Sequence, residues 1–156
     1  MKLFIRCGGI IRSGPERDLI DTYLKRGNQL ARQKGYPQII EDEVDLKRCK
    51  DRHEETQKIL GPTPNPDLRI FLDERGKSLK TYEMANKLNE MRRESGTNIQ
   101  FVIGPADGFD TALMPSGAIK WRLGAQTWPH KLLRAMLAEQ VYRIYSIWAG
   151  TPYHRE

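Results

Sequence analysis

The chain has 156 residues and a formal net charge of +6 at pH 7, and 38% of its residues are hydrophobic. This length and composition suit a single globular domain over residues 1–156 and exclude a disordered chain or a small disulfide-stabilised scaffold. The sequence has neither an apolar run of the roughly 20 residues that span a membrane nor the apolar stretch of a signal peptide, so we expect a cytoplasmic protein without membrane contact.

The first part of the chain predicts a strand, a helix and a second strand. Residues 2–7 are predominantly apolar and predict a short strand. The Gly pair behind it permits a sharp turn, whereas a phosphate cradle would need the full GxGxxG pattern. Apolar side chains at helical spacing predict an amphipathic helix over 15–33. Residues 38–44 predict the second strand, near an edge of the sheet.

The charged segment 46–60 predicts an exposed helix. It carries a run of basic side chains, Lys47, Arg48, Lys50 and Arg52. Such a run is typical of a solvated helix face. It is also compatible with contact to an RNA backbone, which the basic net charge of the chain weakly supports. The sequence leaves both interpretations open.

The second part of the chain predicts three further strands with one helix among them. A stiff, proline-rich connector over 61–66 precedes them, and it marks no domain boundary because neither flank is large enough to fold alone. The expected elements are a strand over 68–72 bounded by charged residues 73–77, a helix over 81–94, a strand over 99–103 with a turn at 104–108, and a strand over 118–123.

The last helix is predicted by apolar residues at i, i+3 and i+4 spacing from Leu133 to Trp148. Pro129 suits its first turn, where a backbone N–H is not needed, and Gly150 ends it. A charged tail, residues 152–156, follows. Chain ends are usually solvated, yet this one contains Tyr, His and Arg, which recur at chemical sites.

The alternation of strands and helices predicts an α/β fold with a mainly parallel sheet flanked by helices on both faces. In open sheets of this kind, ligands bind outside the carboxyl ends of the strands. Three such ends are chemically distinctive, at Leu72-Asp73, at 104–108 and at 123–128. We expect these three ends to converge if their strands are neighbours.

The sequence predicts no metal site. The cysteines, Cys7 and Cys49, form no CxxC pair, and the three histidines are scattered without an HExxH pattern.

The C-terminal stretch PHKLLRAMLAEQVYRIYSIWAGTPYHRE resembles the signature of the SPOUT-class RNA methyltransferases, specifically the RlmH family. The resemblance extends over nearly the whole length, since that family is also a short domain that begins with a strand like 2–5. It implies a C-terminal trefoil knot, with the last helix threaded through a loop. It further implies a homodimer that binds S-adenosylmethionine and methylates N3 of a pseudouridine in 23S ribosomal RNA.

The resemblance also implies which residues contact the cofactor, largely through their backbone. By motif position these are Leu72, Gly104, Leu123, Gly124, Ala125, Gln126, Thr127 and Trp128. The chain departs from the family where Gly104-Pro105 replaces a usual Gly-Gly, because proline lacks a backbone donor. If that donor contacts the cofactor in relatives, we expect weaker binding here.

The tail supplies the catalytic candidates, Tyr153, His154 and Arg155. Arg155 suits a phosphate or a developing imide anion. His154 suits removal of the N3 proton near neutral pH, and Tyr153 suits stacking on the base or a hydrogen bond to it.

Three alternatives stay open at this point. One is a methyltransferase that acts on a different RNA. Another is a non-catalytic RNA- or ribosome-binding module on the same fold. The last, if the resemblance is set aside, is a nucleotide-binding doubly wound domain, for which the Gly pair after the first strand is poor support.

Overall fold

The computed structural model describes residues 1–62 and 67–155, in which strands and α-helices alternate along the chain. The strands are β1 (Lys2–Gly8), β2 (Gln38–Val44), β3 (Leu68–Ser78), β4 (Ile99–Ile103) and β5 (Ile119–Arg122). The helices are α1 (Pro15–Lys34), α2 (Arg52–Leu60), α3 (Thr81–Ser95) and α4 (His130–Ala149), with a short 3-10 turn, η1 (Thr111–Leu113), before β5.

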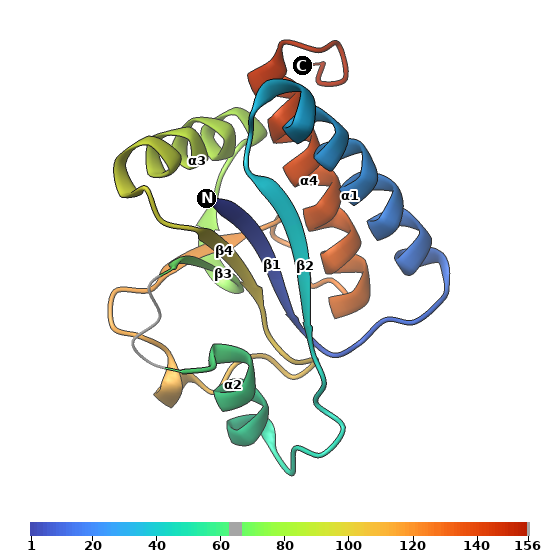
Figure 1. The fold of residues 1–156 in the computed structure, drawn as a ribbon. Coiled ribbons are helices and arrows are strands. Elements are labelled where there is room, and N and C mark those ends of the chain that lie inside the picture. Colours follow the sequence, from blue (N-terminus) through green and yellow to red (C-terminus); the bar gives the residue numbers. More distant parts are fainter. Residues whose placement is uncertain (63–66, 156) are drawn as a thin grey trace.

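The five strands form one sheet in the order β2-β1-β4-β3-β5 (Figure 1). Every strand pair is parallel, with Leu3 opposite Ile99 in β1 and β4, and Ile70 opposite Phe101 in β3 and β4. The predicted α/β fold with a parallel sheet is therefore confirmed, and β2 lies at an edge as expected.

Alternating side chains of the sheet enter two separate cores. Leu3, Ile5 and Cys7 of β1 face the main core, which the sheet shares with α1, α3 and α4. On the opposite face, Phe71 and Val102 pack with Ile59 of α2 in a smaller core. Helices cover both faces, but three lie on one side and a single short helix on the other (Figure 1).

Helix α4 returns from one edge of the sheet toward the other. It follows β5, at one edge, yet packs along α1 and alongside α3 (Figure 1). The hydroxyl of Tyr145 donates to the carbonyl of Pro37, just before edge strand β2, at 2.7 Å. The indole N–H of Trp148 donates to the carbonyl of Ala85 in α3 at 3.0 Å. This path is consistent with the knotted C-terminal segment that the resemblance implies.

A buried arginine joins α4 to the carboxyl ends of β1 and β2. Arg134 is 1% exposed, and its guanidinium pairs with Glu41 at 3.2 Å and with Glu43 at 2.7 Å. It also donates to the carbonyls of Gly8 and Gly9 at 3.2 and 2.8 Å. A charge this deeply buried is tolerated because its two terminal nitrogens donate to carboxylates and carbonyl oxygens.

Two element boundaries differ from the expectation. Helix α2 begins at Arg52 rather than at 46, because Asp51 is its N-cap and accepts a hydrogen bond from the backbone N–H of Glu54. Most of the basic run therefore lies in the loop before the helix. The connector over 61–66 lies mainly outside the described residues.

Strand β3 continues to Ser78, so the predicted end at 72 was wrong. Its pairing with β5 shifts register between Leu72 and Lys77, which makes an irregular bulge of the residues between them. A Cβ on Gly76 would lie 2.6 Å from the backbone of Trp121. Glycine is needed here for close approach to β5, and not for a turn that ends the strand.

Within the described residues, no helix is long and apolar enough to cross a membrane.

We predict that Arg134→Ala lowers the free energy of unfolding by about 3–5 kcal/mol, because it removes the nearest cation of Glu43 and leaves Glu41 with Arg17 alone. Urea denaturation measures the loss. Arg93, which is exposed on α3, provides the matched control, and Arg93→Ala is expected to change stability by less than about 0.5 kcal/mol. Equal effects of the two substitutions would contradict the prediction.

Candidate functional site

A cavity of about 340 Å³ opens at the carboxyl ends of β4 and β5, beside the bulge in β3. Its walls come from the bulge of β3 (72–75), from the turn after β4 (103–109), and from the segment after β5 that leads to α4. The three distinctive strand ends of the sequence thus lie around one space, because their strands are neighbours in the sheet.

Most of the residues expected to contact a cofactor line this cavity: Leu72, Gly104, Leu123, Gly124, Gln126, Thr127 and Trp128. Ala125 lies in the same loop but does not line the cavity. Their juxtaposition follows from the strand order, whereas their role in binding stays a prediction.

The loop between β5 and α4 is closed by one of its own side chains. The indole N–H of Trp128 donates to the carbonyl of Leu123 at 2.8 Å. Gly124 has a φ of 90°, a conformation that side-chain-bearing residues rarely adopt. This tight turn brings backbone groups to the cavity wall, which suits recognition of a ligand through peptide N–H and C=O groups.

The turn after β4 forms the opposite wall. Gly104 packs on the ring of Phe109, since a Cβ at this position would lie 3.1 Å from the ring carbons. The backbone N–H of Gly108 donates to the carbonyl of Pro105 at 2.9 Å and closes the turn. Pro105 lacks an N–H, so this wall offers one backbone donor fewer than a Gly-Gly sequence would.

The cavity also has a charged rim that sequence reasoning did not identify. Asp73, Arg75, Asp107, Arg122 and Arg52 are among the residues that line it. Asp73 and Asp107 follow strand ends, which is a usable signal for ligand contact in parallel sheets. Arg52 belongs to the basic run for which the sequence left RNA contact open, and its position at the cavity comes from the fold.

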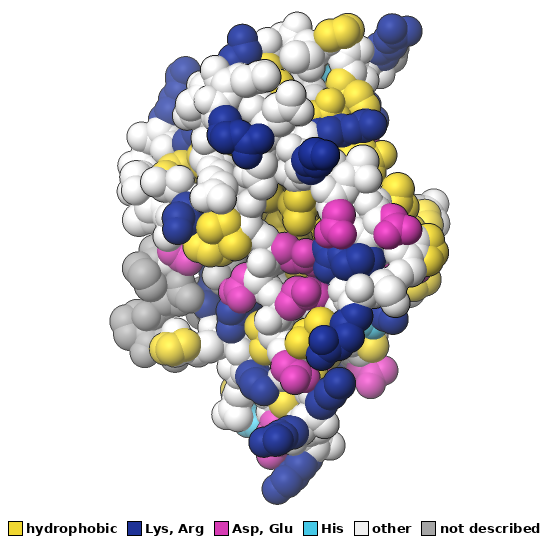
Figure 2. Space-filling model, turned by 45° about the vertical axis from the view of Figure 1, so that its right-hand side comes forward, with side chains coloured by type: hydrophobic (Ala, Val, Ile, Leu, Met, Phe, Trp, Pro, Cys, Tyr) yellow, Lys and Arg dark blue, Asp and Glu magenta, His cyan; other side chains and the backbone are white. Residues whose placement is uncertain are grey.

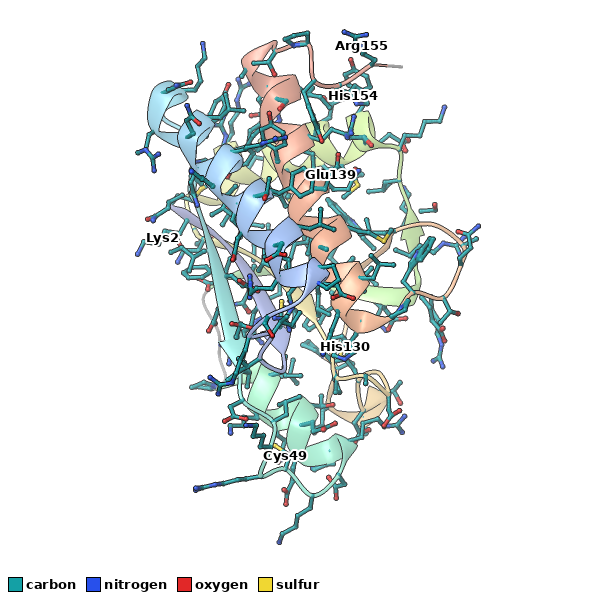
Figure 3. All side chains as sticks on the ribbon, turned by 90° about the vertical axis from the view of Figure 1, so that its right-hand side faces the viewer. Lys2, Cys49, His130, Glu139, His154 and Arg155 are labelled. Atoms are coloured by element: carbon teal, nitrogen blue, oxygen red, sulfur yellow. The ribbon has the colours of Figure 1, made fainter. Side chains whose placement is uncertain are left out.

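His130, the first residue of α4, also lines the cavity (Figure 3). Burial, and then the positive charges of Arg134 and Lys131, lower the pKa of its imidazole. A neutral ring at the cavity wall can accept or donate a hydrogen bond without adding positive charge. By residue type alone His130 is a residue at the start of a helix, and its position at the cavity comes from the fold.

The tail lies at the other end of α4, away from the cavity of its own subunit (Figure 3). Helix α4 has 20 residues, which at 1.5 Å per residue corresponds to about 30 Å. Tyr153 and His154 are half-buried against the helices, whereas Arg155 is exposed. Within one subunit, the structure therefore does not bring the catalytic candidates Tyr153, His154 and Arg155 together with the cavity.

A second cavity of about 360 Å³ lies between α3 and α4, and it shares Arg122, Leu123 and Gly124 with the first. Glu139, which lies between His130 and His154 along α4 (Figure 3), lines this second cavity. The tail hydroxyl of Tyr153 donates to Glu139 at 3.0 Å. The side chain of Glu139 thus lies between the tail and the loop that follows β5.

Comparison with known proteins supports a specific family. The family described as Predicted SPOUT methyltransferase matches residues 1–154. The chain is 42% identical to ribosomal RNA large subunit methyltransferase H of Maricaulis maris, with 100% of each chain covered. It is 39% identical to the protein of that name from Dinoroseobacter shibae and 36% identical to that from Nitrobacter hamburgensis, with 99% of each chain covered in both comparisons.

We predict that His130 titrates below the usual histidine pKa of 6.5 and is neutral at pH 7. The unfolded chain then takes up a proton first as the pH falls, so His130 lowers the free energy of unfolding progressively below about pH 6.5. An NMR titration of the ring protons, assigned with His130→Asn, measures the pKa. A value of 6.5 or higher would contradict the prediction.

Proposed function

Because this chain belongs to the SPOUT methyltransferase family, we propose that it transfers the methyl group of S-adenosylmethionine to N3 of a pseudouridine in 23S ribosomal RNA. The observation that carries the proposal is the cavity at the carboxyl ends of β4 and β5, beside the bulge in β3. Residues that the family resemblance marks for the cofactor surround this cavity, although they come from three separate segments.

The cavity suits a cofactor of this size and chemistry. Its volume of about 340 Å³ lies in the range of small-molecule sites, roughly 300–1,000 Å³. Gly104 and the loop from Leu123 to Trp128 would hold the cofactor through backbone groups, and Leu72 would supply an apolar contact. The acidic residues that line the cavity, Asp73, Glu74 and Asp107, are balanced by Arg52, Arg75 and Arg122, which suits a ligand with both positive and negative groups. When bound, S-adenosylmethionine supplies an electrophilic methyl group on its sulfonium.

The residues of the chain have two tasks in such a transfer. They must hold the base so that N3 faces the methyl group in line with the breaking bond, and they must favour loss of the N3 proton. We assign both tasks to the tail. Arg155, which is exposed, suits a phosphate or the charge that develops on the base. Tyr153 and His154 lie beside it and suit contacts with the base itself.

The position of the tail argues for a homodimer. The tail begins beyond the last turn of α4 and reaches back along the helix only to Glu139, which is nine residues, or about 14 Å along the axis, from His130 at the cavity. A symmetric dimer in which α4 of each subunit lies against its partner would place the tail of one subunit at the cavity of the other. We therefore infer a composite site, in which one subunit holds the cofactor and its partner supplies the tail.

The surface near the cavity suits an RNA substrate. Lys47, Arg48, Lys50 and Arg52 are exposed in and after the loop that precedes α2, and Arg52 also lines the cavity. Figure 2 shows a group of Lys and Arg side chains at the lower tip of the molecule, the end at which α2 and the loop before it lie in Figure 1. Phosphate contacts of this kind position an RNA without reading its sequence. A ribosomal substrate places the protein in the cytoplasm.

One observation favours a second candidate. Pro105 removes a backbone donor from the wall of the cavity, as expected of a non-catalytic RNA- or ribosome-binding module that has lost its cofactor. We rank it second because the turn around Pro105 is intact and closed by the hydrogen bond from Gly108.

We predict that the protein binds S-adenosylmethionine with about one site per subunit, and binds neither ATP nor NAD. Isothermal titration calorimetry measures all three ligands. Pro105→Gly restores a backbone donor. One hydrogen bond contributes about 0.5–1.5 kcal/mol, so this variant is expected to bind S-adenosylmethionine up to about tenfold more tightly. A folded protein with no affinity for S-adenosylmethionine would favour the non-catalytic module.

We predict that two inactive variants restore activity when they form mixed dimers. Thr127→Trp fills the mouth of the cavity at an exposed position, and a tail variant carries His154→Ala with Arg155→Ala. A mixed dimer then holds one intact cavity and one intact tail. Random mixing is expected to recover about a quarter of wild-type methylation of ribosomes that lack the modification.

Sedimentation and circular dichroism establish that each variant is folded and dimeric. Full loss of activity in every mixture would mean that cavity and tail act within one subunit, and a wild-type monomer at micromolar concentration would exclude the composite site altogether.

A further inference from the structure

Two residues of α4 hold the C-terminal tail. The hydroxyl of Tyr153 donates to Oε1 of Glu139 at 3.0 Å. The same carboxylate oxygen accepts from Nε of Arg143 at 2.8 Å and from its Nη2 at 2.5 Å. Glu139 and Arg143 lie one helical turn apart and form an ion pair. Because Tyr153 donates to the same carboxylate, this ion pair also holds a residue of the tail.

Aromatic contacts strengthen this arrangement. The guanidinium of Arg143 lies over the ring of Tyr153, 4.6 Å from its centroid, and the ring of Tyr142 packs on Tyr153 at the same centroid distance. Burial, followed by hydrogen bonds with Tyr23 and Glu139, raises the pKa of Tyr153, so its hydroxyl stays protonated and keeps donating. The hydrogen bond that Arg143 donates to Glu139 raises the pKa of Arg143.

The arrangement extends to His154 and defines the state of its ring. Nη1 of Arg143 lies 3.4 Å from Nδ1 of His154 in hydrogen-bonding geometry. A guanidinium has donors but no acceptor, so Nδ1 must present its lone pair. In a neutral imidazole the proton then sits on Nε2. Across residues 1–62 and 67–155, Nε2 of His154 has no hydrogen-bond partner, although it is shielded from solvent.

We propose that Glu139 and Arg143 are positioning residues that fix His154 as its Nε2–H tautomer, so that the tail offers the RNA base a hydrogen-bond donor. This inference rests on the proposed function and deepens it. It assigns His154 a different task from removal of the N3 proton, since the lone pair that would accept a proton is held by Arg143.

A donor is useful in this reaction because of where the charge develops. When N3 loses its proton to a water molecule and on to bulk solvent, negative charge spreads over the two neighbouring carbonyl oxygens of the base. A fixed N–H directed at one of them stabilises that charge. The N3 lone pair then forms the new bond to the methyl carbon, and the electron pair of the broken S–C bond stays on sulfur.

Access to Nε2 requires only a local movement. The ring of Tyr82 packs nearly perpendicular to the ring of His154, with centroids 4.8 Å apart. Tyr82 is an exposed side chain of α3, 43% accessible to solvent. Rotamer changes of exposed side chains take picoseconds to nanoseconds, so Tyr82 can turn aside when a base arrives. Glu139 and Arg143 are half-buried and keep their positions.

Long-range ¹H–¹⁵N NMR of histidine-labelled protein tests the tautomer directly. At about pH 8.5, well above the usual histidine pKa of about 6.5, we expect His154 to show a protonated Nε2 and an unprotonated Nδ1. His154→Gln assigns the signals. Arg143→Ala is expected to remove the preference between the two nitrogens, whereas the exposed control Arg93→Ala leaves it unchanged. A proton on Nδ1 in the wild type, or no effect of Arg143→Ala, would overturn the proposal.

Kinetics test the role in catalysis. Glu139→Gln and Arg143→Lys are expected to lower kcat by about 10- to 100-fold through misplacement of the tail, with the KM for S-adenosylmethionine unchanged. Arg143→Lys keeps a donor and is expected to retain more activity than Arg143→Ala. An equal loss in these two variants, or a raised KM, would indicate a merely structural role and overturn the assignment.

The pH profile separates a donor from a base. The groups around His154 are Arg143 and Glu139 of α4, Tyr82 of α3, and Tyr153 and Arg155 of the tail, with Tyr23 of α1 behind Tyr153. With His154 as donor, kcat is expected to rise with pH through and above neutrality. A plateau above a histidine-like inflection, which His154→Gln abolishes, would make His154 the base and overturn the proposal.

The tautomer measurement needs neither cofactor nor RNA. An inactive wild-type protein that shows the Nε2–H tautomer would therefore contradict the proposed function while the geometry of the tail stands. An active protein with the proton on Nδ1 would contradict the inference alone.

Discussion

The arrangement of this molecule depends on the buried guanidinium of Arg134. Helix α4 must reach from β5, at one edge of the sheet, to the far side of the main core, and Arg134 fastens it there to Glu41 and Glu43 of β2. A buried charge without partners is very unfavourable. The ion pairs of Arg134 therefore favour the position of α4 in which its guanidinium meets Glu41 and Glu43. His130, one turn earlier in the same helix, is thereby held at the wall of the cavity.

Helix α4 then sets the distance between the two parts of the proposed site, the cavity and the tail. Its first residue lines the cavity, and its last turn carries the tail. Helix α4 packs on both α1 and α3, and the tail folds back along it only as far as Glu139, so within one subunit it does not reach His130 at the cavity. The same constraint that seats α4 therefore favours a site shared between two subunits.

The sequence predicts the fold well where the physical signal is local. Alternation such as Leu3, Ile5 and Cys7, and the apolar stripe of α4, reflect burial and can be read from neighbouring residues. The start of α2 and the bulge of β3 were missed because they depend on a cap and on the approach of Gly76 to another strand. For the site, strand ends were visible in the sequence, but the separation of tail and cavity depends on three-dimensional packing.

Backbone recognition explains how the cavity can tolerate the unusual Pro105. The parallel register of β3, β4 and β5 sets where their ends lie, so the walls depend on peptide groups more than on side chains. In the turn after β4, the carbonyl of Pro105 accepts from Gly108, and this bond does not use the donor that proline lacks. The substitution therefore preserves the shape of the wall and removes a single point of contact. Under the proposed function, it weakens cofactor binding and leaves unchanged the tail that Glu139 and Arg143 hold on α4.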